Sequence, residues 1–312
     1  MTLSIIDFHS HYVDPHWPLS ADHQATGSER ERWNRINRQL TSREALLQDV
    51  ESGDLAARII NTPTALFSPL TGRRAPDTWQ RINDDIAVLT AEHPGRLHAL
   101  ASVDAFAGDS AARELTRAVR DLGLRGVFVE SAKGTSLLDA PEARPTLQVA
   151  AELGVPVFAH PINPRPLSRQ LAPYGRLGTL LARGTVNAAT LIALLESGVF
   201  DELPKLQVVV TTLAIGGVLL AGGFGDASGV RTDAASLLRR NVYIDTMNFN
   251  PVLIRAAVDL LGADHVLAGS DWPIVSEGPI RQRAEQAFAA AALTPAEQTL
   301  IAAGNTKRLL RI

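Results

Sequence analysis

Cysteine is absent from all 312 residues of this chain. Without thiols the protein forms no disulfide, offers no thiolate ligand to a metal and has no cysteine nucleophile. Any metal that it binds must therefore be held by histidine, aspartate or glutamate side chains.

An excess of positive charge is also missing. The formal net charge is −3 and the isoelectric point is about 6.2, so no positive field favours nucleic acid or an anionic membrane. The N-terminus lacks the features of a signal peptide, and we expect a cytoplasmic protein. Residues 206–225 are long enough to span a bilayer, but the β-branched first half and the Gly216-Gly217 pair predict a buried strand that leads into a helix.

What the sequence does contain is a series of short apolar runs separated by helical patterns. We identify eight such runs, at residues 3–8, 57–62, 96–103, 124–130, 155–160, 206–212, 241–246 and 265–270. Strands that alternate with helices predict an α/β fold with a parallel sheet, and eight of them predict a (β/α)8 TIM barrel in a single domain, residues 1–312. An open doubly wound sheet would need a glycine-rich turn after its first strand, where this chain has histidines.

The polar segment 14–41 is too long for an ordinary connection between a strand and a helix. Loops of this size are usually functional or disordered. We therefore expect an insertion after the first strand that acts as a lid or as a substrate-binding element.

The first strand ends in two histidines, His9 and His11, within "DFHSH". Alternate side chains of a strand share a face, so we expect Asp7, His9 and His11 to point one way and Phe8 the other. Two imidazoles on one face reach a single ion. Asp7 lies deeper on that face, where it either orients a ligand histidine or serves packing inside the barrel.

Two further candidate ligands stand at the ends of other predicted strands. His160 ends the fifth run in "VFAHP", and Asp271 follows the eighth in "GSDWP". The carboxyl ends of barrel strands meet at one mouth, where barrel active sites are built. We therefore predict that His9, His11, His160 and Asp271 converge on one metal ion.

The ordered set "DFHSH", "VFAHP", "GSDWP" and the terminal "GNTKRLL" resembles the amidohydrolase superfamily, in particular the amidohydrolase-related branch that includes aminocarboxymuconate semialdehyde decarboxylase. The resemblance covers essentially the whole chain. It implies a distorted (β/α)8 barrel with one divalent metal, usually zinc, with manganese as the alternative. It also implies that His9, His11 and His160 are metal ligands, and that Asp271 is a ligand, an acid/base, or both.

One position departs from that family pattern. Family members commonly end the sixth strand with a histidine, where this chain has Thr212 in "VVVTTLAIGG". A threonine hydroxyl donates a hydrogen bond but is no general base near neutral pH. Three explanations stay open: Asp271 performs all proton transfer, another histidine takes the role, or the usual reaction has been lost. The candidate replacements are His16, His23 and His98.

The favoured hypothesis is nonoxidative decarboxylation of a small aromatic or unsaturated carboxylic acid, with Asp271 as the proton donor. This reaction needs no strong base that activates water. The alternative is metal-dependent hydrolysis of a lactone, ester or amide. A third hypothesis is a metal-free or inactive binding barrel.

The remaining candidates concern the substrate and the assembly. Arg73, Arg74 and Arg165 follow the second and fifth strands, and their guanidinium groups suit a carboxylate. Trp272 either stacks on an aromatic substrate or packs the rim. The polar candidates for substrate contact are Asn163 and Thr212. We expect no nucleic-acid or membrane partner, and the apolar helices leave room for a homo-oligomer.

Overall fold

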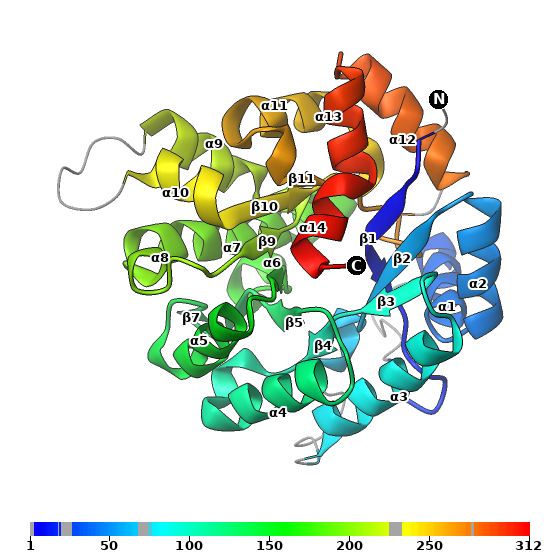
Figure 1. Ribbon diagram of the computed structural model, residues 1–312, viewed down its shortest axis with the longest axis horizontal. Helices are drawn as coiled ribbons and strands as arrows, with labels where there is room; N and C mark the ends of the chain where they lie inside the picture. Colours follow the sequence, from blue (N-terminus) through cyan, green and yellow to red (C-terminus); the bar gives the residue numbers. More distant parts are fainter. Residues whose placement is uncertain are drawn as a thin grey trace.

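A parallel β-barrel surrounded by helices forms the body of the protein (Figure 1). The computed structural model describes residues 3–17, 19, 27–67, 75, 77–224, 233–275 and 278–312. The barrel strands of this part are β1 (Ile6–His11), β2 (Ala57–Asn61), β3 (Leu97–Ala99), β4 (Ala101–Ser102), β5 (Val127–Glu130), β8 (Val157–His160), β9 (Val208–Val210), β10 (Val242–Asp245) and β11 (Val266–Leu267). A small hairpin, β6 (Ala132–Lys133) with β7 (Ser136–Leu137), follows β5.

The strands form two arcs that backbone hydrogen bonds join into a closed barrel. One arc has the order β1-β2-β3 and the other β11-β10-β9-β8-β5-β4. Strands β3 and β4 are consecutive pieces of one run, since Leu100 N donates to Ile60 O and Ala101 N to Gly126 O. On the other side, Phe8 N donates to Ala268 O and His11 N to Trp272 O, both at 2.8 Å. Each of the eight predicted strand segments is present, and the predicted (β/α)8 class is confirmed.

Helices follow the strands and cover the outside of the barrel (Figure 1). They are α1 (Gly27–Leu40), α2 (Arg43–Ser52), α3 (Thr78–Glu92), α4 (Asp109–Arg120), α5 (Arg144–Leu153), α6 (Arg165–Leu171), α7 (Gly175–Glu196), α8 (Val199–Glu202), α9 (Ile215–Phe224), α10 (Ala234–Asn241), α11 (Pro251–Leu261), α12 (Ile280–Ala290), α13 (Pro295–Thr299) and α14 (Asn305–Leu310). Local caps fix several helix starts. The Asn250 side chain accepts from the first turn of α11, and Thr294 with Glu297 forms a capping box on α13.

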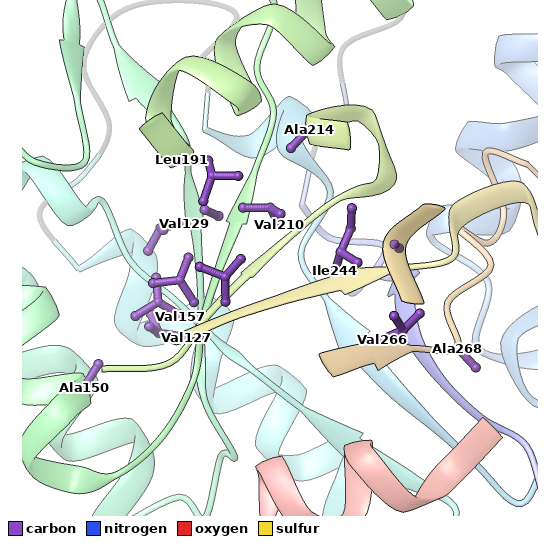
Figure 2. Packing of buried hydrophobic residues seen from close by; sticks show 14 of the residues in the cluster. Val127, Val129, Ala150, Val157, Leu191, Val210, Ala214, Ile244, Val266 and Ala268 are labelled. Carbon is purple, nitrogen blue, oxygen red and sulfur yellow. The ribbon is translucent and has the colours of Figure 1, made fainter. Parts of the chain in front are cut away.

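Alternation along the strands separates two apolar layers. Outward-facing residues such as Val127, Val157 and Val210 pack against the helices, with Leu191 of α7 and Ala150 of α5 among their neighbours (Figure 2). The inward-facing residues fill the barrel with a second cluster that includes Phe8, Phe128, Phe158, Val209, Tyr243 and Leu267. Leu309 and Leu310 of α14 join this inner cluster, so the C-terminal helix closes the amino-terminal end of the barrel.

The apolar segment 206–225 forms β9, a short 3-10 turn and α9, as expected for a core strand that leads into a helix. By length and hydropathy alone, the stretch Arg165–Glu196 also passes as a membrane span, with 39% of its most apolar window buried in the protein. This stretch contains α7, whose Asn187 side chain donates to Ser131 Oγ and Ala159 O at 2.8 Å. The helix is therefore bonded to the carboxyl ends of the barrel strands.

Candidate metal centre

A β-bulge in β1 sets the direction of the first two histidines. Ile6 pairs with Ala57 and Ser10 with Ile60, so four steps along β1 match three steps along β2. The extra residue lets Phe8 and His9 both face the barrel interior, where each ring lies about 5 Å from the ring of Phe158 (5.2 and 5.0 Å between centroids).

The expectation of strict alternation was therefore wrong for this strand. The bulge reverses the faces, and Asp7 points outward from the barrel to Arg58 instead of sharing a face with His9. Asn61 stabilises the bulge, because its side-chain amide donates to Phe8 O at 3.2 Å and Ser10 O at 3.1 Å.

His9 and His11 present bare nitrogens to each other. The Nδ1 atom of His9 lies 2.5 Å from Asp245 Oδ2, and that of His11 lies 3.3 Å from Thr62 O. Both partners only accept hydrogen bonds, so each Nδ1 carries the proton and each neutral Nε2 carries a lone pair. These two Nε2 atoms are 3.1 Å apart. Two lone pairs at this separation repel unless a cation lies between them.

Asp271 and His160 complete the cluster. Asp271 Oδ1 lies 3.4 Å from His9 Nε2 and 3.3 Å from His11 Nε2. One ligand atom from each of His9, His11, His160 and Asp271 lies within 4.8 Å of the others, and all four residues are buried. Donors held ~2.0–2.1 Å from one ion at tetrahedral angles lie about 3.3–3.4 Å apart. The spacing and the donor types thus fit one divalent cation.

The protonation states favour metal binding. Burial lowers the pKa of His11, and burial together with the neighbouring histidines lowers that of His160 well below its usual value. Burial also lowers the pKa of His9, but Asp245 and Asp271 outweigh it and the net change is upward. Burial raises the pKa of Asp271, yet the adjacent histidines reverse this and the net change is downward. These shifts favour neutral imidazoles at His11 and His160 and an ionised carboxylate at Asp271, while the two carboxylates beside His9 favour its positively charged form in the absence of another cation.

Asp245, at the end of β10, is a site residue that the sequence analysis missed. Besides holding His9 Nδ1, it accepts from the backbone N–H of Thr212 at 2.9 Å and of Met247 at 3.0 Å. The signal was available, since an acidic side chain ends a barrel strand in "NVYIDT". Its place, behind a ligand nitrogen, is typical of carboxylates that orient metal-binding histidines.

Thr212 also lies beside the cluster, but its contacts run to Asp245. Its hydroxyl donates to Asp245 O and lies 3.1 Å from Asp245 Oδ1. The side chain is buried, and both its backbone N–H and its hydroxyl bond this one carboxylate residue. Thr212 thus holds the group that orients His9.

Asp271 is held in a left-handed backbone conformation, with φ of 57°. Such a conformation is costly for a non-glycine residue, so the neighbouring contacts must fix it. Asp271 N donates to His9 O at 2.7 Å, while Asp7 accepts from Ser270 N at 2.9 Å and from Ser270 Oγ at 2.7 Å. Asp7 therefore positions the Asp271 segment from outside the strand.

The structure contradicts a role for Trp272 in substrate stacking. Its side chain is 1% exposed and packs in the outer apolar cluster, with the guanidinium carbon of Arg58 4.8 Å from the ring centroid. Next to an inward-facing Asp271, the following residue turns outward. Trp272 therefore packs the rim and presents no free face to a ligand.

Of the other predicted substrate residues, the two that the structure describes do not belong to the metal cluster. Asn163 and Arg165 are exposed, between β8 and the start of α6. Arg73, Arg74 and His23 lie outside the described residues. Among the histidines considered as replacements, His16 is on the surface beside Asp14 and Asp85, and His98 is on β3 near the opposite end of the barrel. Neither belongs to the four-residue cluster.

A second missed residue, Arg183 of α7, lies at the mouth. It interacts electrostatically with Asp271 and with His160, and burial lowers its pKa. Arg32 of α1 also interacts with Asp271 and donates to Ile274 O at 2.8 Å. Neither position has a sequence motif, because both arginines reach the mouth from helices through tertiary packing.

The barrel and its cluster define a metal-binding (β/α)8 protein with one divalent-ion site at the carboxyl ends of the strands. A family model described as "Amidohydrolase" matches residues 6–312. The chain belongs to this family.

Known relatives extend over most of the chain. Gamma-resorcylate decarboxylase of Rhizobium sp. (strain MTP-10005) is 27% identical over 285 residues, covering 85% of each chain. The 2-amino-3-carboxymuconate-6-semialdehyde decarboxylase of Dictyostelium discoideum is 23% identical over 296 residues, covering 86% of this chain and 81% of the relative. Both are decarboxylases, in agreement with the reaction favoured from the sequence.

A solved structure confirms the fold. The dihydroxybenzoic acid decarboxylase from Polaromonas sp. JS666, with bound manganese and the inhibitor 2-nitroresorcinol, superposes with a TM-score of 0.85 at 21% identity. The match covers 99% of this chain and 97% of that chain.

Gly269 tests the tight packing behind His9. A Cβ at this position would lie 2.8 Å from His9 Cβ and 3.2 Å from Asp245 Cβ. We expect Gly269→Ala to displace His9 and to weaken metal affinity by about 10- to 100-fold, the usual effect of disturbing the partners of a ligand. The measurement is metal competition with a chelator. Gly216→Ala is the matched control, because its Cβ meets nothing within 4 Å; equal affinities in the two variants would contradict the assignment.

The ligand set is tested by single substitutions. We expect His11→Ala and His160→Ala each to abolish retention of a stoichiometric metal ion, because each removes a buried donor from a set of four. Elemental analysis of folded protein after desalting measures this. His93→Ala, near the start of β3 and bonded to Arg43, should retain the metal. A His11→Ala variant with full metal content would show that this histidine is not a ligand.

Proposed function

We propose that this protein is a metal-dependent decarboxylase that removes carbon dioxide from an aromatic carboxylic acid. The observation that carries the proposal is that the carboxylate of Asp271 is partly exposed within a cluster that also contains three histidines, and we assign the acid/base role to it. Its side chain is 11% exposed, whereas those of His9 and Asp245 are 0% exposed. Asp245 is committed to His9 and Thr212, so proton transfer falls to Asp271.

The charge of the mouth suits an acid. A divalent ion in the cluster would be balanced by Asp271 and by the more distant Asp245. Arg183 and Arg32 add positive charge beside Asp271, and Arg176 lies near Arg32. A substrate carboxylate would offset this excess.

The chain's own groups account for the proton step. Bound to the cluster, a divalent ion would supply Lewis-acid polarisation of substrate oxygen atoms. The bond between the ring carbon and the carboxyl carbon breaks, its electron pair stays on the ring carbon, and carbon dioxide leaves. Asp271 contacts the histidines through Oδ1, and we assign the proton step to Oδ2. Oδ2 takes a proton from solvent and delivers it to that carbon as the bond to the carboxyl carbon breaks, so Asp271 is an ionised carboxylate again at the end of each turnover.

Hydrolysis places a heavier demand on this site. Attack by water requires a base to take its proton and an acid to protonate the leaving group. Within the described residues the cluster contains one accessible carboxylate and no histidine at the end of β9, where Thr212 is bonded to Asp245. Decarboxylation requires one proton donation, which Asp271 alone supplies.

Finer assignments belong to this proposal. Three imidazoles and a carboxylate suit zinc or manganese; the Polaromonas relative holds manganese, so both ions enter the test. We further propose a cytoplasmic enzyme, for which a homo-oligomer stays a prediction. Segment 14–41 remains a proposed lid or substrate-binding insertion, and Arg32 of its helix α1 donates to Ile274 O.

The reaction is tested with gamma-resorcylate and related hydroxybenzoic acids. We expect protein loaded with manganese or zinc to release carbon dioxide and to place one solvent deuterium on the ring carbon in D2O, because Asp271 exchanges its proton with solvent. Removal of the metal should abolish turnover, and its return should restore it. Mass spectrometry distinguishes loss of carbon dioxide from gain of water. Turnover of esters or lactones by the loaded protein, with none of the acids, would favour hydrolysis instead.

Asp271→Asn separates proton transfer from metal binding. The amide keeps an oxygen toward His9 and His11 but carries no transferable proton, so we expect most of the metal to remain while kcat falls by about 10²- to 10⁴-fold. Steady-state rates at matched metal content measure the effect. Asp259→Asn, in an exposed pair with Arg255 on α11, is the control. Unchanged kcat in Asp271→Asn would exclude this proton donor.

A further inference from the structure

Arg183 lies on the face of α7 that covers the barrel mouth. Asn187, one turn further along, donates to Ser131 Oγ and Ala159 O, and the Thr190 hydroxyl donates to Ser131 O at 2.5 Å. Residues separated by four and seven positions share one side of a helix. At Gly184 a Cβ would lie 2.8 Å from Leu213 O, so the helix backbone sits directly on the segment that follows β9.

The guanidinium of Arg183 has no protein partner in the described part of the chain. It forms no hydrogen bond or ion pair there, although it is only partly exposed. It interacts electrostatically with Asp271 and His160. A partly buried cation next to a divalent-ion site is unfavourable unless an anion joins it. Its five donors suit a planar carboxylate.

The other arginines of the mouth are placed differently. Arg32 donates to Ile274 O, and its guanidinium carbon lies 5.4 Å from the ring centroid of Trp33. Arg176 is exposed at the start of α7. Arg183 is thus the arginine near Asp271 that combines partial burial with unused donors in the described residues.

We propose that Arg183 binds the carboxylate of the substrate and so selects aromatic acids over neutral aromatic compounds. The proposal rests on the proposed function for the identity of the substrate class. Because the carboxylate leaves as carbon dioxide, the contact is lost at the product, and the neutral phenol dissociates without having to break it.

The test compares an acid with its neutral product in metal-loaded protein. We expect Arg183→Gln to weaken binding of gamma-resorcylate by about 10- to 100-fold, the effect of losing a charge-assisted hydrogen bond, and to change binding of resorcinol by less than about threefold, because resorcinol lacks the carboxylate. Calorimetric titration measures both. Arg183→Lys should recover part of the affinity for the acid, since it keeps the charge but not the fork. Arg113→Gln, an exposed arginine of α4, is the matched control.

The outcomes separate this inference from the proposed function. Equal loss of affinity for acid and resorcinol, unchanged affinity for the acid, or loss of the metal from Arg183→Gln would overturn the role of Arg183. If the unsubstituted protein binds the acid through Arg183 but releases no carbon dioxide, the inference stands and the decarboxylase assignment falls. If the unsubstituted protein releases carbon dioxide and Arg183→Gln has unchanged KM and kcat, the decarboxylase assignment stands and the role of Arg183 falls.

Discussion

The mutual repulsion of unprotonated ligand atoms is the constraint around which this barrel mouth is arranged. His9 and His11 bring two lone pairs to 3.1 Å, and Asp271 adds a carboxylate oxygen at 3.3–3.4 Å. Each histidine has its proton fixed on the far nitrogen, by Asp245 or by Thr62 O. These atoms repel one another in a buried site, where water does not screen the repulsion, and a cation bound between them would remove it. Packing of the two apolar layers must supply the stability that keeps these groups together without the ion.

Residues behind the ligands fix the positions of the ligand side chains. Asp245 links His9 to Thr212, and so couples β1, β9 and β10 at one point. On the outer face, Arg58 bridges Asp7 of β1 and Asp49 of α2, while Asp7 holds Ser270 just before Asp271. The buried pair of Arg58 and Asp7 therefore joins β1 to β2 and, through Ser270, also positions Asp271, the proposed acid/base residue. A charged network of this kind is costly to bury, and its position beside the strained backbone of Asp271 gives it a functional reason.

The sequence predicts those features that depend on local pattern and on the topology of the barrel. The apolar runs predict all eight strands, and the rule that strand ends meet at one mouth predicts that His9, His11, His160 and Asp271 lie together. The bulge in β1 has no such signature, because it depends on the pairing with β2 and on the Asn61 amide, and it reverses the predicted face of Asp7. The positions of Arg183 and Arg32 could not be predicted for another reason, because they follow from how α7 and α1 pack over the mouth.

The threonine at the end of β9 reduces the number of acid/base groups at the site. A histidine there would add a second titratable group to the site, whereas Thr212 donates its hydroxyl and its backbone N–H to Asp245, which in turn holds His9. A site with one accessible carboxylate favours a reaction in which a single proton is delivered to carbon and the leaving group departs uncharged. Carbon dioxide is such a leaving group. One acid/base group is enough for the single proton delivery of decarboxylation, whereas hydrolysis would need the same carboxylate to take a proton from water and then pass it to the leaving group.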